Sequence, residues 1–127
     1  MIQVLIANDE RAASSLLERV IDRSSDMTCI GCASNGEEAI RMAQALRPEV
    51  VLMDLMMPGI DGVEATKQIK ATVPNTLIVV NTARSDYQDR AMEAGASVVL
   101  TIPISHEMIL DTIRDVVASA RNDYFSQ

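Results

Sequence analysis

Five short apolar segments, each followed by a helical pattern, constrain the fold of this chain more than any other feature of its sequence. The segments are rich in β-branched residues and nearly uninterrupted, which is typical of strands buried on both faces of a sheet. They span Ile2–Ala7, Met27–Cys32, Val50–Met53, Leu77–Val80 and Val98–Leu100. Strands that alternate with helices favour right-handed βαβ units. The pattern therefore predicts an α/β fold in which helices cover both faces of one parallel sheet.

The segments between the strands carry the spacing and the capping residues of amphipathic helices. In the first, apolar side chains recur along one helical stripe, at Ala13, Leu16, Leu17, Val20 and Ile21. Residues that favour helix N-termini open the later segments, at Asn35, Asp61, Ser85 and Ser105. The helical pattern fades close to the C-terminus. We therefore expect one domain over residues 1–121 and a frayed tail or the start of a linker over residues 122–127.

Composition narrows the function classes. Eighteen acidic residues against 11 basic ones give a formal net charge of −7. Such a charge argues against a nucleic-acid-binding surface, because neutralising phosphates requires Lys and Arg. No apolar run approaches the roughly 20 residues of a membrane-spanning helix, and the N-terminus lacks the pattern of a signal peptide. We expect a cytoplasmic protein that binds neither membranes nor nucleic acid directly.

Cys29 and Cys32 form a C-x-x-C pair inside the second predicted strand. A redox pair of the thioredoxin type would lie at a helix N-terminus, where the dipole lowers the thiol pKa. On a regular strand, by contrast, residues three apart point to opposite faces. A structural zinc site needs four ligands, and the one histidine of the chain, His106, is the sole further soft ligand. Both cysteines are therefore interpreted as small buried hydrophobic residues.

Polar residues follow three of the predicted strands. Asp9 comes after the first strand, Asp54 after the third and Thr82 after the fourth. The carboxyl ends of parallel strands meet at one edge of a sheet, where α/β proteins bind their ligands, so these side chains should converge. Two close carboxylates repel each other, and Mg²⁺, which prefers oxygen ligands, would relieve that repulsion. The same cation would help a carboxylate attack phosphorus, and the Thr82 hydroxyl could donate to a phosphoryl oxygen.

Two alternatives remain at this stage. Asp9 and Asp54 could merely cap the helices that follow them, as acidic residues after strands often do. The chain could instead be a phosphatase-like enzyme with its own substrate, but the sequence offers no general base beyond the carboxylates. His106 is expected at the start of the last helix, away from the strand ends, and is interpreted as a surface residue.

Four stretches of the sequence carry family-like motifs: Val4–Glu10, Val51–Gly62 with its Met-Asp-Leu-Met-Met-Pro-Gly core, Asn81–Ala83, and Gly95-Ala96 before the last strand. Through these motifs, and over nearly its whole length, the sequence resembles the receiver (CheY-like) domain of bacterial two-component response regulators. It implies a flavodoxin-like (βα)5, doubly wound fold with five parallel strands in the order 2-1-3-4-5. It also implies a signal-transduction protein with no enzymatic activity beyond self-phosphorylation and autodephosphorylation at Asp54.

The resemblance assigns roles to individual residues. Asp54 matches the phosphoacceptor, which receives its phosphoryl group from a partner histidine kinase in the presence of Mg²⁺. Asp9 matches the principal acidic metal ligand, and Met56 holds the position whose main-chain carbonyl completes the metal shell. Thr82 matches the switch hydroxyl, and Pro103 matches the proline that opens the last helix. Phosphorylation is then expected to change a protein-interaction face.

Three positions depart from the family pattern. Asn8 replaces the first residue of the acidic pair, so it can reach the metal only through water, and Mg²⁺ binding should be weakened. Ile102 stands where the family has a lysine, and Arg84 is considered as a surrogate cation. Val99 stands where active receivers carry an aromatic switch residue. Two interpretations stay open: a receiver phosphorylated at Asp54, or a pseudo-receiver that binds proteins without phosphorylation.

Partners follow from the same resemblance. A sensor histidine kinase is expected upstream, and downstream either a separate protein or an output domain outside this sequence. The segments Ala33–Ala39 and Gly62–Lys70 look most like receivers that carry a helix-turn-helix DNA-binding output domain. A homodimer through the last two helices is a further possibility. The sequence identifies neither the cognate kinase nor the pathway.

Overall fold

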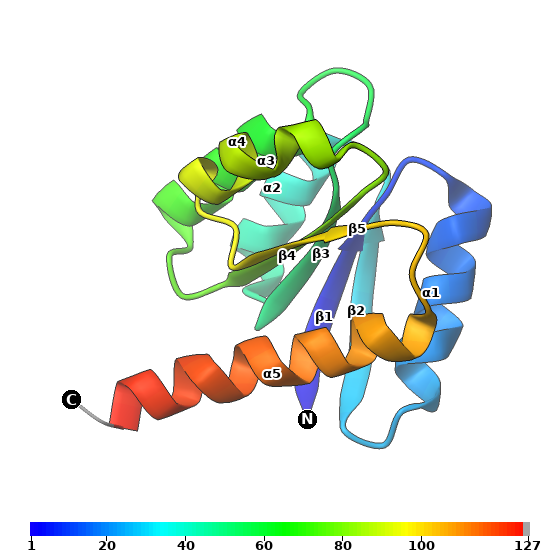
Figure 1. Ribbon diagram of the computed structural model, residues 1–127, viewed down its shortest axis with the longest axis vertical. Helices are drawn as coiled ribbons and strands as arrows, with labels where there is room; N and C mark the ends of the chain where they lie inside the picture. The colour runs from blue at the N-terminus through cyan, green and yellow to red at the C-terminus, as the bar shows by residue number, and fades with distance from the viewer. Residues whose placement is uncertain (126–127) are drawn as a thin grey trace.

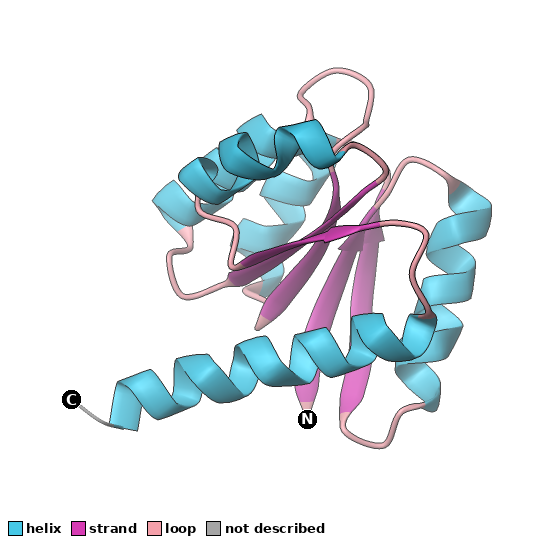
Figure 2. Ribbon diagram, viewed as in Figure 1, coloured by secondary structure: helices cyan, strands magenta, loops and turns pink. Residues whose placement is uncertain are grey.

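The computed structural model describes the backbone of residues 1–125 and the side chains of residues 1–122. Strands and helices alternate along the chain (Figures 1 and 2): β1 (Ile2–Ala7), α1 (Arg11–Arg23), β2 (Met27–Ala33), α2 (Gly36–Leu46), β3 (Val50–Asp54), α3 (Gly62–Thr72), β4 (Leu77–Thr82), a 3-10 turn (Ser85–Tyr87), α4 (Gln88–Ala94), β5 (Val98–Thr101) and α5 (His106–Phe125). All strand pairs are parallel, in the order β2-β1-β3-β4-β5. The predicted fold class and strand order are confirmed.

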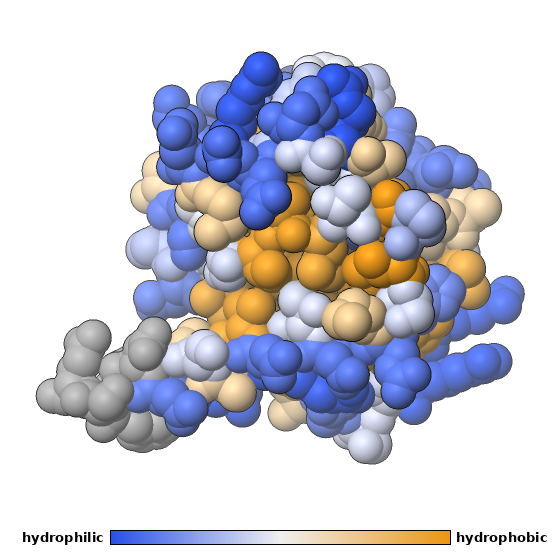
Figure 3. Space-filling model, viewed as in Figure 1, coloured by the Kyte–Doolittle hydropathy of each residue, from blue (hydrophilic) through white to orange (hydrophobic). Residues whose placement is uncertain are grey.

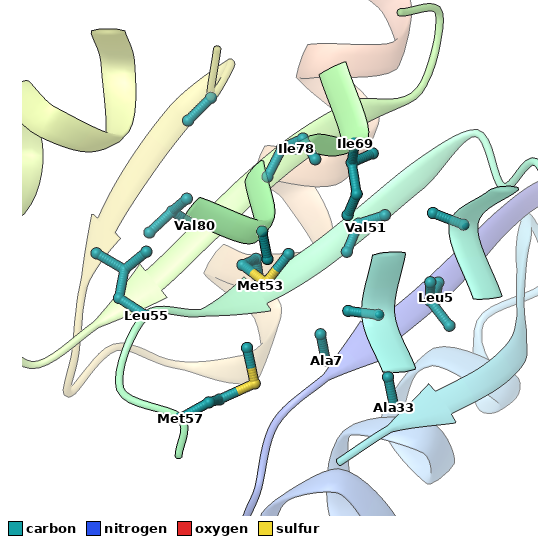
Figure 4. Close-up of a cluster of buried hydrophobic side chains, with 14 of the residues drawn as sticks. Leu5, Ala7, Ala33, Val51, Met53, Leu55, Met57, Ile69, Ile78 and Val80 are labelled. Atoms are coloured by element: carbon teal, nitrogen blue, oxygen red, sulfur yellow. The ribbon is translucent and has the colours of Figure 1, made fainter. Parts of the chain in front are cut away.

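Each face of the sheet carries its own apolar core because side chains alternate along the strands. On β3, Val51 and Met53 join the core under α2, α3 and α4, which Figure 4 shows in close-up. Val50 and Leu52 on the same strand pack instead toward α1 and α5. Burial of both faces explains the uninterrupted apolar character of the strand segments.

Helix ends agree with most of the predicted capping residues. The side chains of Asn35 and Asp61 accept hydrogen bonds from the N–H groups of Glu38 and Glu64, at 2.8 and 2.9 Å. The Ser105 hydroxyl accepts one from Met108 N–H at 3.1 Å. Ser85 is an exception, because a 3-10 turn begins there and α4 starts only at Gln88.

The last helix is longer than the apolar pattern indicated. Helix α5 runs to Phe125 and so covers most of the range predicted as a frayed tail. Residues 126–127 lie outside the described part of the chain, and the domain boundary at residue 121 stays a prediction. Within the described residues, no helix has the length and apolar character needed to cross a membrane.

Strand β2 departs from the regular geometry that the sequence predicts. Its register with β1 pairs Cys29 with Val4 but Gly31 with Leu5, so one residue is inserted as a β-bulge. The bulge shifts the alternation in such a way that Cys29 and Cys32 face the same side of the sheet. Their sulfur atoms lie 4.0 Å apart. The prediction that the two thiols point to opposite faces was therefore wrong.

Candidate functional site

Asp54 ends β3 at the carboxyl edge of the sheet, beside Asn81 on β4. Its carboxylate accepts a hydrogen bond from Met56 N–H at 3.2 Å, which fixes the turn after the strand. Burial raises the pKa of Asp54 above its ordinary value. The Met56 hydrogen bond opposes that shift, and the negative charges of Asp9 and Glu10 add to it. Asp54 is thus a half-buried acceptor in an acidic setting, and a cation or an incoming proton would relieve the cost of its charge.

A cavity of about 220 Å³ opens beside Asp54. Asn8 and Glu10 line it from the loop after β1, Asn81 from β4, Ile102 from the segment after β5, and His106 from the start of α5. The ends of β1 and β4 and the segment after β5 therefore border Asp54. Of the three side chains predicted to converge, only Asp54 lines this cavity, whereas Asp9 and Thr82 do not.

The loop after β1, which contains Asn8, Asp9 and Glu10, lines two adjoining hollows. The Asn8 amide oxygen accepts a hydrogen bond from Glu10 N–H at 2.8 Å, so only its second lone pair remains available to a metal-bound water. Asp9 is exposed and lines an adjoining hollow between α1 and β2, within electrostatic range of Asp54. We call Asn8, Asp9, Asp54 and Asn81 the carboxylate edge.

Asn81 supplies a test of whether the carboxylate edge suits a hydrated cation. Its side-chain oxygen is buried and has no hydrogen-bond partner among the side chains and backbone that the structure describes. A buried acceptor without a donor is costly, and a metal-bound water would provide the donor. Together with the carboxylates of Asp9 and Asp54, this oxygen gives the all-oxygen surroundings that Mg²⁺ prefers. The residues present therefore fit a hydrated Mg²⁺ ion.

Thr82 ends β4 and is fully buried. Its hydroxyl oxygen accepts a hydrogen bond from Arg84 N–H at 3.0 Å. The hydroxyl proton remains free to donate, because a hydroxyl combines one donor with two acceptor sites. Thr82 is thus held by the loop that follows it.

Arg84 is engaged outside the cavity. Its guanidinium pairs with Asp86 through two hydrogen bonds of 2.8 and 3.0 Å and lies 5.1 Å from the centroid of the Tyr87 ring. The ion pair raises the pKa of Arg84 and lowers that of Asp86. The structure therefore does not bring the predicted surrogate cation to Asp54.

Ile102 lies at the cavity, as the resemblance to receivers implies for the residue at that position. It is 36% exposed, and its N–H donates to the Thr82 carbonyl at 2.8 Å. The peptide bond from Ile102 to Pro103 is cis. Val99, the second residue of β5, packs against the core under α2, α3 and α4. An apolar side chain thus borders Asp54 at the place where the resemblance puts an ammonium group.

Sequence reasoning missed two residues of this cavity. His106 starts α5 and is exposed, as predicted, but it also lines the same hollow as Asp54 and Ile102. The connection from β5 to α5 folds back over the strand ends, and no periodicity in the sequence reports such a path. Asn81 was recognised as a strand-end residue but given no role. Its position directly before Thr82 was the signal that could have assigned it one.

Beyond the cavity, β5 forms the edge of the sheet between α4 and α5. Its residues Val98, Val99 and Leu100 are only partly buried. Figure 3 shows apolar side chains gathered on this face and bordered by hydrophilic ones. A shallow groove of about 400 Å³ there is lined by Val98, Asp115 and Val116 among others. Partly exposed apolar surface of this kind commonly marks a protein-interaction face.

Comparison with known proteins gives consistent matches. The sequence matches the response regulator receiver domain over residues 4–114. It is 34% identical over 123 residues to the response regulator GacA of Pseudomonas aeruginosa, in a match that covers 95% of this chain and 58% of the relative. It is 39% identical over 109 residues to protein-glutamate methylesterase/protein-glutamine glutaminase 4 of Myxococcus xanthus, in a match that covers 84% of this chain and 31% of that protein. The chain thus spans between 31% and 58% of these relatives.

Solved structures agree with the strand order and the helix positions. The response regulator domain of Thermotoga maritima CheB has a TM-score of 0.87 at 29% identity, over 93% of this chain and 97% of that one. A two-component response regulator of the LuxR family from Aurantimonas has a TM-score of 0.87 at 27% identity, over 92% of this chain and 85% of that one.

Proposed function

Because the chain belongs to the response regulator receiver domain family, we propose that Asp54 accepts a phosphoryl group from a partner sensor histidine kinase. The observation that carries this proposal is the setting of Asp54: a half-buried carboxylate at the strand ends, beside an open cavity and close to a second acidic side chain. Phosphorylation would turn the receiver into its signalling state. We expect no enzymatic activity beyond self-phosphorylation from small donors and autodephosphorylation.

In the transfer, a carboxylate oxygen of Asp54 attacks phosphorus and forms the acyl phosphate bond. The bond from phosphorus to the histidine nitrogen of the donor breaks, and its electron pair stays on that nitrogen. Asp9, Asp54 and the Met56 carbonyl would hold Mg²⁺, with Asn8 and Asn81 accepting from its waters. The ion would supply positive charge against the phosphoryl oxygens. Met56 N–H keeps the attacking carboxylate oriented throughout.

The missing lysine should make this transfer slow. Ile102 offers no charge, and Arg84 is bound to Asp86. His106 lines the cavity from the start of α5, and its ring N–H is a hydrogen-bond donor for a phosphoryl oxygen there. Removing one preorganised donor that stabilises developing charge costs about 3 kcal/mol in the transition state, or about 100-fold in rate.

The signal would leave through the face of α4, β5 and α5. Breaking the hydrogen bond from Arg84 N–H to the Thr82 hydroxyl would free the loop before α4. Val99 is small and packs against the core, so this face has no large side chain at that position that could reorient. A pseudo-receiver that binds proteins through the same face without phosphorylation is the second candidate. The apolar Ile102 beside Asp54 is the observation that favours it.

Our proposal extends to the localisation, the downstream partner and the oligomeric state of the protein. GacA and the LuxR-family structure are response regulators, and this chain covers 58% of GacA. We propose a cytoplasmic protein that acts on a downstream partner or a helix-turn-helix output domain. A homodimer through α4 and α5 is consistent with the partly exposed apolar face between them.

Intact-mass spectrometry after incubation with acetyl phosphate and Mg²⁺ tests the proposal. The wild type should gain one phosphoryl adduct that Asp54→Ala lacks and that chelation of Mg²⁺ prevents. Ile102→Lys should accelerate formation of the adduct, by up to about 100-fold if the missing charge limits transfer. His106→Ala should slow it severalfold. A wild type and an Ile102→Lys variant that both stay unmodified would support the pseudo-receiver.

A further inference from the structure

A second group of ligand atoms lies between α1 and β2. The carboxylate of Glu18 on α1 approaches both thiols of β2: its Oε2 atom is 3.5 Å from Cys32 Sγ and 3.9 Å from Cys29 Sγ. The two sulfur atoms are 4.0 Å apart. We call Glu18, Cys29 and Cys32 the thiol cluster. Its three ligand atoms all lie within 4.8 Å of one another.

Local structure fixes this arrangement. The β-bulge in β2 turns both thiols to the side of the sheet that α1 covers. Asp22, one turn after Glu18 on α1, accepts a hydrogen bond from Cys29 N–H at 2.8 Å and ties the helix to the strand. The Cys29 thiol also contacts the Gly31 carbonyl at 3.3 Å. The cluster is therefore held by backbone geometry and not by flexible side chains alone.

The separations match those of ligands around one tetrahedral ion. Zinc takes sulfur at about 2.3 Å and carboxylate oxygen at about 2.0–2.2 Å, which at tetrahedral angles places two sulfurs about 3.8 Å apart and a sulfur and an oxygen about 3.6 Å apart. The observed distances are 4.0 Å between sulfurs and 3.5 and 3.9 Å from oxygen to sulfur. An ion could thus enter with movements of only a few tenths of an ångström.

We propose that Glu18, Cys29 and Cys32 form a Zn²⁺ site whose fourth position is open to water or to an external ligand. Glu18 and Cys32 also line the hollow of about 630 Å³ between α1 and β2, so the open position faces solvent-accessible space. Three protein ligands and an open position are the pattern of zinc sites that bind a further molecule. The site differs from the carboxylate edge in ligand type, although Asn8 and Asp9 of that edge line the same hollow.

Electrostatics support a cation at this place. Partial burial raises the pKa of both thiols, that of Cys32 to about 12, and the negative charge of Glu18 opposes their ionisation further. Asp22 adds a second negative charge near Cys29. Each group disfavours the ionised form of its neighbours, and a divalent cation would reverse that relation by binding all three.

Cobalt titration of the full 127-residue chain tests the site, because four-coordinate Co²⁺ replaces Zn²⁺ and its thiolate complexes absorb strongly in the near ultraviolet. The protein is kept reduced with a phosphine, and mass spectrometry counts free thiols. The wild type should bind one Co²⁺ per chain with thiolate absorption, and Zn²⁺ should displace it while Mg²⁺ should not. Cys29→Ser and Cys32→Ser should each weaken binding by more than the roughly 10–100-fold typical of losing a supporting partner.

Matched variants separate ligands from nearby charges. Glu18→Gln should keep some thiolate absorption and weaken binding roughly 10–100-fold, whereas Asp22→Asn, which removes a neighbouring charge but keeps the acceptor for Cys29 N–H, should change it by less than about threefold. Asp54→Asn should leave the spectrum unchanged. Circular dichroism confirms that each variant is folded.

Three results would overturn the zinc site. The first is a reduced wild type with free thiols that gives no thiolate absorption. The second is saturation at one ion for two chains, which would mean a bridge between molecules. The third is a Cys29–Cys32 disulfide that forms in air while the reduced protein binds no metal, which would make the thiols a redox pair.

Discussion

The carboxylate edge and the thiol cluster each bring together oxygen or sulfur atoms that can bind a metal ion, but the fold assembles them in different ways. At the carboxylate edge, parallel register places the ends of β1, β3 and β4 together, so position along each strand decides which side chains meet. In the thiol cluster, one inserted residue in β2 decides it. The first arrangement follows from topology, and the second from a local irregularity that topology does not determine.

Gly62→Ala should have the largest effect that distinguishes the two regions, because it should disturb the carboxylate edge and leave the thiol cluster intact. A Cβ atom at Gly62 would lie 2.6 Å from Leu55 Cα and still closer to the Asp54 carbonyl oxygen, so the loop that carries Asp54 must move. We expect a loss of about 2–3 kcal/mol in the free energy of unfolding, as for other overpacked sites. Urea denaturation measures this loss. The Mg²⁺ response should fall with it, while cobalt binding by the thiol cluster should persist.

Gly59→Ala is the matched control in the same loop. Gly59 has a φ of +77°, and a Cβ atom added there would have no other atom within 4 Å, so alanine would meet conformational strain without a clash. The expected loss is only about 1 kcal/mol. Equal losses for the two variants, or loss of cobalt binding in Gly62→Ala, would mean that the two regions are not mechanically separate.

The second prediction concerns the pH dependence of cobalt binding. Below the raised pKa values of Cys29 and Cys32 both thiols carry protons, and a bound ion must displace them. The association constant should therefore rise by up to about 100-fold per pH unit between about pH 6 and 8. Mg²⁺ binding at the carboxylate edge should change far less over this range. Titrations at several pH values measure the slope, and a slope near zero would exclude thiolate ligation.

The two regions also differ in how far the sequence predicted them. Asp9, Asp54 and Thr82 could be placed because each follows a recognisable buried strand, and parallel strands end at one edge. Cys29 and Cys32 were assigned to opposite faces because a regular period was assumed, and the bulge at Ile30 reverses that result. Ile30 is a typical strand residue, so its identity gives no sign of an irregularity.

Loop paths were the other feature that the sequence did not specify. The link between β5 and α5 places the start of α5, and with it His106, at the cavity. The turn after β4 pairs Arg84 with Asp86 and so keeps it away from Asp54. Both results depend on backbone conformations outside strands and helices. Hydrophobic periodicity carries no information about such segments, whereas it located every strand within two residues of its observed ends.

The third prediction is stabilisation by Mg²⁺ at the carboxylate edge. At a concentration about ten times the dissociation constant, Mg²⁺ should stabilise the wild type by about 1.4 kcal/mol. Thermal unfolding with and without Mg²⁺ measures it. Asp9→Asn should abolish most of the shift, and Cys32→Ser should preserve it. Asn8→Asp should strengthen binding by on the order of 1 kcal/mol by restoring the second acidic residue. Equal shifts in wild type and Asp9→Asn would place the ion elsewhere.

The smallest expected effect is a gain in stability from Asp54→Asn. Because burial and the nearby acidic groups raise the pKa of Asp54 in the folded protein, its ionised form destabilises the fold at neutral pH. Asparagine carries no charge and can still accept from Met56 N–H, so the variant should be more stable by up to about 1 kcal/mol in chelator at about pH 7. The advantage should shrink as pH falls toward the ordinary aspartate value of 3.8, below which the wild-type carboxyl is protonated in both states. Unfolding of both proteins across this pH range measures the difference. A gain in stability that did not depend on pH would point to packing and not to the charge of Asp54. The carboxylate edge would then no longer differ from the thiol cluster in carrying an unfavourable buried charge.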